Sequence, residues 1–167
     1  MPASILSVRN LRKFFPIPGG WLGKDAHYVR AVDDVSFDLA PGETLGLVGE
    51  SGCGKTTAGR VIMGLEKATQ GEVRLNNSQN LALLTPKEWR PFRRQIQMIF
   101  QDPYSSLNPR MTVGAIISEP IAVHGLAKNR AERRDRVASL FEQVGLPADA
   151  MERYPHEFSG GQRQRVG

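Results

Sequence analysis

The eight residues GESGCGKT, at positions 49–56, decide the fold class of this chain. They fit the pattern G-x-x-x-x-G-K-[ST], in which glycines let the backbone curl so that successive N–H groups face a chain of phosphates. Residues 44–48 form a short apolar run typical of a buried strand, and residues 55–63 favour a helix that ends at Gly64. A buried strand, a glycine-rich turn and a helix in this order predict a phosphate-binding loop.

Two side chains of this loop have the chemistry that a nucleotide site requires. Lys55 is expected to reach the beta and gamma phosphates. The Thr56 hydroxyl is expected to ligate Mg²⁺, which prefers oxygen ligands shared with phosphate and water. Cys53, beside Lys55 and a helix N-terminus, is a candidate for a reactive thiol. We interpret it instead as a tolerated small side chain, because phosphate contacts in such loops come mainly from the backbone.

The residues before the loop predict strands. Residues 4–10 and 29–39 carry β-branched and aromatic side chains with partial alternation, and turns are expected at 33–34 and 41–42. Between the two strands, residues 16–23 are rich in proline and glycine, which disfavour both a ladder and a helix. We therefore expect a surface loop there.

The residues after the loop predict shorter elements. Residues 71–75 alternate like a strand of a hairpin, and residues 85–88 match a capping box with Pro86 at the first helical position. Pro91 should keep that helix short. Residues 95–100 alternate at first, so we expect a strand that runs into a loop.

From position 112 onward the pattern indicates helices, with no convincing strand. Apolar residues recur at i, i+3, i+4 and i+7 ahead of Gly145, which marks a helix end. These four residues are Val137, Leu140, Phe141 and Val144. The second half of the chain is therefore expected to be helical.

The composition limits the class of protein. With 167 residues, 40% of them apolar and 23% charged, the chain can bury a globular core, and no stretch reaches the roughly 18 uninterrupted apolar residues of a membrane span. The single cysteine excludes an internal disulfide, and the N-terminus lacks the pattern of a secretion signal, so we expect a cytosolic location. The net charge of +5 is spread along the chain, which does not favour nucleic-acid binding.

Two further stretches narrow the class: MIFQDPYSSLNP at 98–109 and FSGGQRQR at 158–165. Together with the phosphate loop they resemble the ATPases of ABC transporters, and most of all those of oligopeptide and dipeptide permeases. The second stretch is similar to the family's signature sequence, usually LSGGQ, with Phe158 in place of the leucine. That subgroup tolerates the phenylalanine. The likeness covers essentially the whole chain, with the three motifs in the family's order.

The resemblance implies an α/β fold with a P-loop NTPase core of the RecA-like type, an N-terminal antiparallel β subdomain and a helical subdomain. Residues 1–102 would form the nucleotide-binding core with the β subdomain, and residues 103–167 the helical subdomain that ends in the signature motif. The chain looks truncated after this motif, since the acidic strand end, the glutamate and the late histidine that the family uses for hydrolysis are not present. We therefore expect that residues 1–167 alone do not turn over ATP.

The resemblance also implies roles for single residues. Gln101 would ligate Mg²⁺, and the loop after it would contact membrane subunits. Phe15 is the expected stacking platform for adenine, with Tyr28 as the second choice. By itself the capping box of Ser159 and Gln162 marks only a helix start, but the family uses this segment to bind the gamma phosphate held by the opposite subunit. The expected catalytic residues are Lys55 and Gln101, the expected Mg²⁺ ligands are Thr56 and Gln101, and the expected nucleotide-binding residues are Phe15, Gly49, Glu50, Ser51, Gly52, Cys53, Gly54, Lys55, Thr56, Thr57, Ser159, Gly160, Gly161 and Gln162.

The function implied by the resemblance is that of an ATP-binding subunit, which powers import of peptides or similar small solutes through ATP-driven dimerisation and hydrolysis. Its expected partners are transmembrane permease subunits and a second ATPase subunit, identical or different, with a solute-binding protein engaged indirectly and no nucleic acid. It would lie at the cytoplasmic face of the cell membrane as a peripheral subunit.

Several alternatives share part of the pattern. A small-molecule kinase or a GTPase would share the phosphate loop, but the chain has no Asn-Lys-x-Asp guanine motif. A DNA-repair ATPase of the ABC type would share the signature, although such proteins separate it from the phosphate loop by very long insertions. A non-hydrolysing nucleotide-binding module remains a further alternative. The solute is also open, since importers of nickel and glutathione have similar ATPases.

Overall fold

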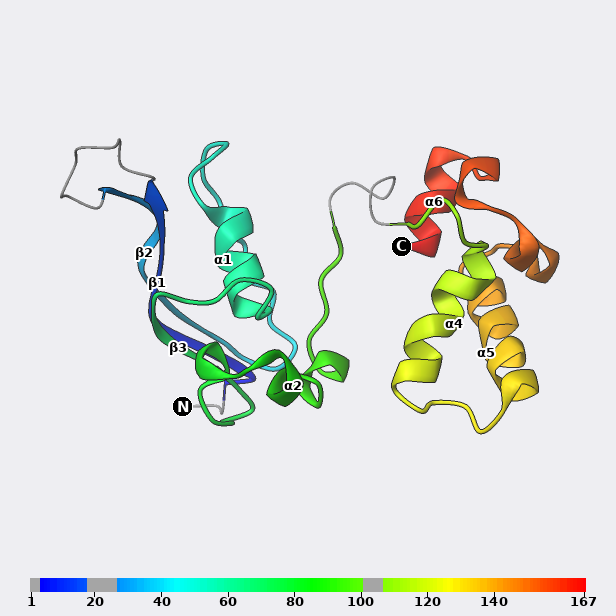
Figure 1. Ribbon diagram of the computed structural model, residues 1–167, viewed down its shortest axis with the longest axis horizontal. Helices are drawn as coiled ribbons and strands as arrows, with labels where there is room; N and C mark the ends of the chain where they lie inside the picture. The colour runs from blue at the N-terminus through cyan, green and yellow to red at the C-terminus, as the bar shows by residue number, and fades with distance from the viewer. Residues whose placement is uncertain (1–3, 18–26, 101–106) are drawn as a thin grey trace. The chain divides into compact units, whose positions relative to one another are not determined.

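The computed structural model describes residues 4–17, 27–100 and 107–167. The chain forms two compact units, Met1–Gln97 and Met98–Gly167. Strands and a few short helices make up the described part of the first unit, whereas that of the second is built from helices (Figure 1).

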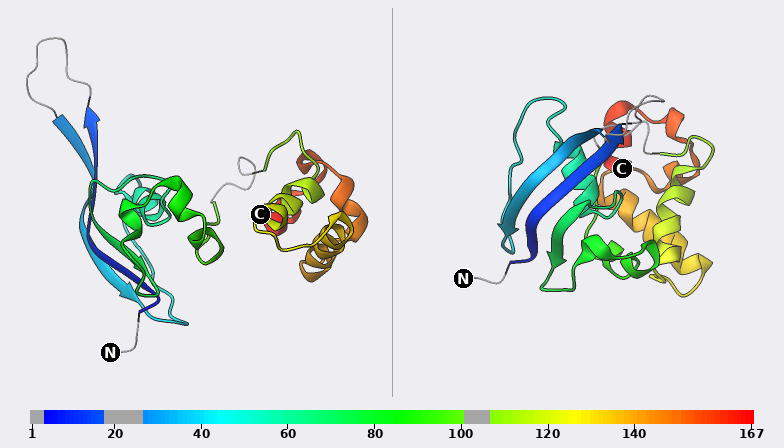
Figure 2. Two further views of the ribbon diagram at one scale, coloured as in Figure 1. Left: turned by 60° about the horizontal axis from the view of Figure 1, so that its bottom comes forward. Right: turned by 60° about the vertical axis from the view of Figure 1, so that its left-hand side comes forward.

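The first unit contains a three-stranded antiparallel sheet with the strand order β2-β1-β3. The central strand is β1 (Leu6–Ile17), flanked by β2 (His27–Leu39) and β3 (Gln70–Leu75). The three strands lie side by side in both views of Figure 2. The strands predicted at 4–10, 29–39 and 71–75 are thus confirmed, although β1 and β2 are longer than expected. Strand β3 pairs with β1, which lies far earlier in the sequence, and not with β2, the strand that precedes it along the chain.

Two local expectations in this sheet are wrong. Residues 33–34 do not form a turn, because β2 runs through them, and Asp34 (φ 62°) instead takes part in a bulge where the β1–β2 register shifts. The Asn10 side chain donates to Asp34 Oδ1 at 2.9 Å and so stabilises the bulge. Pro16 and Ile17, which were expected in a loop at 16–23, pair with β2 instead. The other residues of this expected loop, 18–23, lie outside the described residues.

The helix that follows the phosphate loop covers one face of this sheet. Helix α1 (Lys55–Ile62) buries Ala58 and Val61 in one apolar cluster with Leu11 and Val32 of the strands. Burying one such aliphatic side chain contributes about 1.5–3 kcal/mol, so this cluster fixes the helix against the sheet. The helix predicted at 55–63 is confirmed, with Met63 as its C-cap and Gly64 in the left-handed region.

The C-terminal end of α1 is held by a second contact. Arg93 donates to the carbonyl oxygens of Met63 at 2.5 Å and Gly64 at 3.3 Å, and its guanidinium lies 4.8 Å from the centre of the Trp89 ring. A Cβ on Gly64 would lie 2.2 Å from the Trp89 ring, so only glycine allows this approach. Arg93 thereby satisfies the carbonyls of the C-cap residue and of the glycine after it, whereas backbone N–H groups bind the carbonyls of Arg60 and Val61 near the helix end.

Short helices complete the first unit: η1 (Leu81–Leu83), α2 (Pro86–Trp89) and η2 (Phe92–Arg94). The predicted capping box is present, because the Thr85 hydroxyl accepts from the Glu88 N–H and the Glu88 carboxylate accepts from the Thr85 N–H. Helix α2 ends at Trp89, before Pro91, as expected.

Two predicted strands do not form. Residues 44–48 and 95–100 lie outside any ladder, and Val48 and Ile99 are 93% and 85% exposed. An apolar or alternating run indicates an extended segment, but a strand also needs a neighbour to accept its backbone hydrogen bonds. Among the described residues no segment supplies that neighbour.

From position 112 onward the second unit is built from helices joined by short connections and contains no strand, as predicted. It consists of α4 (Val113–Val123), α5 (Arg130–Gln143), η3 (Ala148–Glu152), η4 (Pro155–Glu157) and α6 (Gly160–Val166). Val137 and Phe141 of α5 are buried in its core, as the periodicity predicted, together with Ile121 and Leu146. Leu140 and Val144 are instead 42% and 37% exposed, because they lie at the edge of the apolar face. No helix within the described ranges is long and apolar enough to cross a membrane.

Candidate functional site

The backbone of residues 49–56 has the conformation that a phosphate loop needs. Gly52 and Gly54 have φ values of 83° and 98°, in the region that favours glycine. A Cβ on Gly54 would lie 2.0 Å from the Ala31 carbonyl oxygen, so no other residue fits between the loop and β2. Gly54 is the N-cap of α1 and offers no side chain to the first turn. The first N–H groups of α1 are therefore left open to an anion.

Lys55 lies over its own loop. Its Nζ donates to the carbonyl oxygens of Gly49 at 2.7 Å and Glu50 at 2.6 Å, and lies 3.6 Å from the Cys53 Sγ. The ammonium group thus occupies the concave side of the loop, where it can exchange carbonyl oxygens for phosphate oxygens. The contact of Lys55 with phosphates stays a prediction.

A cavity of about 280 Å³ lies beside the loop. It is lined by residues 52–57 and by Val29, Arg30 and Ala31 of β2. Arg30 is a cationic residue that the sequence analysis missed; its guanidinium lies 5.6 Å from the Phe14 ring centre and 3.4 Å from the Asp33 carboxylate. No local pattern marks Arg30, because only the packing of β2 against the loop brings it to the cavity.

The stretch FSGGQ begins helix α6 in the second unit. The Ser159 hydroxyl accepts from the Gln162 N–H at 3.3 Å, and the Gln162 side chain accepts from the Ser159 N–H at 2.9 Å, which confirms the predicted capping box. Phe158 is only 4% exposed and belongs to the core of the unit. Its place in the signature is therefore explained by packing, since the position takes a large apolar side chain.

The comparison with protein families settles the class. The model of the family described as ABC transporter matches residues 32–167. The chain belongs to the ABC transporter family. The resemblance inferred from its three motifs is confirmed.

Individual relatives of this ABC chain are described as ATP-binding proteins of transport or import systems. The oligopeptide transport ATP-binding protein OppF of Bacillus subtilis (strain 168) is 53% identical over 167 residues, 100% of this chain and 52% of the relative. AppF, from the same strain and with the same description, is 50% identical over 165 residues, 98% of this chain and 50% of the relative. The glutathione import ATP-binding protein GsiA of Salmonella typhi is 52% identical over 162 residues, 97% of this chain and 26% of the relative. The chain thus spans about half the length of the first two relatives and about a quarter of the third.

Solved structures confirm the expected fold class. The dimeric post-hydrolysis state of the ATP-binding cassette MJ0796, bound to ADP and Pi, matches with a TM-score of 0.78 and 29% identity, over 96% of this chain and 66% of that one. A second dimeric structure of MJ0796, described as a bacterial ABC transporter cassette, matches with a TM-score of 0.75 and 28% identity, with the same coverage. The chain therefore has the α/β P-loop NTPase fold of ABC cassettes.

The ABC loop offers one side-chain oxygen of the kind that Mg²⁺ binds. Thr56, the second residue of α1, is exposed, and its hydroxyl has no hydrogen-bond partner among the described residues. A hydroxyl next to a phosphate site is one of the oxygen ligands that Mg²⁺ takes when phosphate and water supply the others. Gln101, the second expected ligand, lies outside the described residues.

The two aromatic candidates lie near the end of the β1–β2 pair at which Ile17 pairs with His27. Phe15 is opposite Val29, a residue of the cavity lining, whereas Tyr28 is opposite Pro16. Phe15 is 36% exposed, with the Lys13 Nζ lying 4.5 Å from its ring centre, and Tyr28 is 54% exposed. Both side chains are therefore partly exposed to solvent, with the Lys13 ammonium over the Phe15 ring.

Proposed function

We propose that this chain binds MgATP at residues 49–57 and is the ATP-binding part of a subunit that powers import of peptides or similar small solutes. The observation that carries the proposal is the glycine-capped start of α1, with its open N–H groups and with Lys55 folded over the loop. The relatives named for oligopeptide transport support the choice of solute.

The proposed chemistry follows from the loop. Backbone N–H groups of residues 49–57 hold the phosphates, and Lys55 leaves the carbonyl oxygens of Gly49 and Glu50 to pair with the beta and gamma phosphates. Lys55 thereby stabilises charge that develops during phosphoryl transfer. Thr56 and Gln101 would hold Mg²⁺, which neutralises phosphate charge when bound.

We propose Phe15 as the adenine platform, because its cross-strand partner Val29 lines the cavity beside the loop. Base stacking on an aromatic ring contributes about 1–3 kcal/mol. Removal of the ring should therefore weaken nucleotide binding without abolishing it.

We further propose that two ATP-binding subunits close on the nucleotide, with Ser159, Gly160, Gly161 and Gln162 of one chain facing the gamma phosphate on the other. The dimeric state of the MJ0796 cassettes supports this arrangement. In this scheme residues 1–102 form the nucleotide-binding core and residues 103–167 the helical subdomain. The subunit would contact transmembrane permease subunits at the cytoplasmic face of the membrane.

Uptake by cells tests the proposed solute. The copy in the genome is replaced by Lys55→Ala, or by Lys67→Ala as a control on an exposed lysine outside the loop. Uptake of labelled tri- to pentapeptides should be lost with Lys55→Ala and kept with Lys67→Ala. Loss of glutathione uptake alone would favour the second candidate, which the 52% identity to GsiA supports. Unchanged uptake of both solutes would contradict the proposal.

A further inference from the structure

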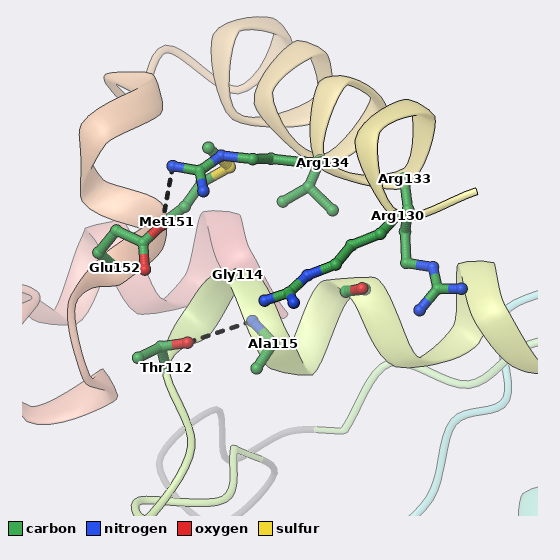
Figure 3. Close-up of a pocket in the computed structure, with 10 residues that line it drawn as sticks. Thr112, Gly114, Ala115, Arg130, Arg133, Arg134, Met151 and Glu152 are labelled. Atoms are coloured by element: carbon green, nitrogen blue, oxygen red, sulfur yellow. Dashed lines mark hydrogen bonds and ion pairs between the residues drawn. The ribbon is translucent and has the colours of Figure 1, made fainter. Parts of the chain in front are cut away.

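The second unit contains a cavity of about 350 Å³ that lies apart from the signature stretch in sequence (Figure 3). Its walls are the start of α4 at Thr112, Gly114 and Ala115, and the first turns of α5 at Arg130, Arg133 and Arg134. Helix η3 closes it with Met151 and Glu152. All of these residues belong to the unit Met98–Gly167.

The cavity has more positive than negative charge. Three arginine side chains line it, but Glu152 is the one carboxylate among its lining residues, and that group already pairs with Arg134 at 3.0 Å. Within the described ranges Arg130 and Arg133 make no ion pair, and the Nε of Arg133 is shielded from solvent without a hydrogen-bond partner. A shielded donor without a partner is costly, which favours an acceptor at this place.

The backbone at the start of α4 adds further donors. The Val113 N–H donates to the Arg153 carbonyl at 2.9 Å, and the Ala115 N–H to the Thr112 hydroxyl at 3.3 Å. The Gly114 N–H between them has no partner among the described residues. In Figure 3 the Arg130 side chain points toward Ala115 in this turn. The positive end of α4, a helix of 11 residues, and an unpaired guanidinium therefore meet in one cavity.

We propose that this cavity binds a phosphate group of a small ligand, of the size of a diphosphate. Arginine presents planar donors that match phosphate oxygens, and the two unpaired arginines offset the charge of about −1.5 to −2 that one terminal phosphate group carries at neutral pH. A cavity of about 350 Å³ holds a diphosphate with room for water or an attached group. The site lies beyond the proposed function, because it uses none of the residues proposed to bind ATP.

Titration calorimetry with inorganic pyrophosphate tests the site. The protein carries Lys55→Ala throughout, so that the phosphate loop contributes little to the signal. Adding Arg130→Gln and Arg133→Gln together should weaken pyrophosphate binding at least tenfold, because two charged donors are lost. The control, Arg136→Gln, lies on the same helix but pairs with Glu132 and does not line the cavity, so it should change the affinity less than twofold.

Two further measurements separate a folding defect from a loss of binding and identify the source of the phosphate group. Arg130 is exposed at the first position of α5, so Arg130→Gln alone should keep the thermal midpoint and still weaken binding severalfold. Arginine-dependent retention on phosphatidylglycerol vesicles, reversed by pyrophosphate and missing on phosphatidylcholine vesicles, would assign the phosphate to a lipid headgroup. Binding of pyrophosphate without retention on vesicles would assign it to a free ligand. No binding in either arm, or equal affinity in all variants, would overturn the proposal.

Discussion

At the scale of single residues, Gly54 and Lys55 carry the proposed nucleotide site. Gly54 combines a φ of 98° with a space that the Ala31 carbonyl fills, and Lys55 sits on the concave side of the loop through two carbonyl bonds. Both residues belong to the eight that the sequence marked first, whereas the Ala31 carbonyl belongs to β2. The left-handed turn and the cation are therefore encoded locally, but the lack of space at position 54 comes from packing against the sheet.

Replacing Gly54 by alanine should disrupt this loop. A Cβ at a φ of 98° and 2.0 Å from a carbonyl oxygen forces the backbone to move, which should cost more than about 1 kcal/mol of stability and displace the N–H groups of the loop. MgATP affinity should fall in fluorescence titrations. Gly46→Ala is the matched control, because a Cβ there meets nothing within 4 Å. Equal affinities for the two variants would contradict this account of the loop.

The thiol of Cys53 reports occupancy of the loop. Cys53 is exposed and its Sγ lies 3.6 Å from the Lys55 Nζ, at the place where phosphates should bind. Saturating MgATP should therefore slow alkylation by iodoacetamide, followed by mass spectrometry, because the bound phosphates block the approach to the thiol. Identical labelling rates with and without MgATP would count against nucleotide binding at this loop.

At the scale of elements, features that depend on nearby residues were predicted correctly, whereas strands that need a distant neighbour were not. The capping boxes at Thr85 and Ser159 were predicted correctly, because each depends on residues only three positions apart. The runs at 44–48 and 95–100 were wrongly predicted as strands, because a strand depends on a neighbour that the run itself does not encode. The bulge at Asp34 was mistaken for a turn for a different reason, since aspartate is common in turns and also tolerates the positive φ of this bulge.

The start of α5 should make the stability of the second unit depend on pH. Hydrogen bonds from the Lys128 N–H and from the Arg136 guanidinium hold the pKa of Glu132 below its ordinary value. A lowered pKa gives stability that is present above the ordinary carboxyl value of about 4.3 and is lost as the pH falls through the lowered one. Urea unfolding should therefore show Glu132→Gln to be less stable than wild type at pH 7, with the difference shrinking as the pH falls below the ordinary carboxyl value of about 4.3.

The control for this prediction is Glu142→Gln on the same helix, whose side chain makes no hydrogen bond or ion pair among the described residues. It should leave the unfolding midpoint nearly unchanged at pH 7 and at pH 3. A deficit for Glu132→Gln that stays the same from pH 7 to pH 3 would show that its carboxylate does not contribute through these bonds.

At the scale of the whole molecule, the family could be predicted from the sequence, but the residues that line the cavities could not. Three short motifs identified the ABC class through their resemblance to the family, whose model matches residues 32–167. Arg30 beside the loop and the arginines of the second cavity were missed. Their positions depend on how strands and helices pack, which no local spacing records.

Assembly of two subunits can be tested separately from nucleotide binding. Ser159→Arg places a long side chain where we propose that the partner's gamma phosphate lies, so ATP-dependent dimerisation should be lost while ATP binding is kept. Analytical ultracentrifugation with a non-hydrolysable ATP analogue measures the first, and equilibrium titration the second. Ser159→Ala controls for loss of the cap of α6, about 1 kcal/mol, and Ser139→Arg for added charge on an exposed site. Loss of ATP binding together with dimerisation would argue against a site shared by two chains.

The central claim is that residues 49–57 bind MgATP through Lys55, and the affinity for MgATP measures it most directly. Titration calorimetry should give an affinity at least tenfold weaker for Lys55→Ala than for wild type, because a cation paired with phosphate oxygens is lost, and an unchanged affinity for the exposed control Lys67→Ala. The same MgATP affinity in wild type and in folded Lys55→Ala would contradict the account.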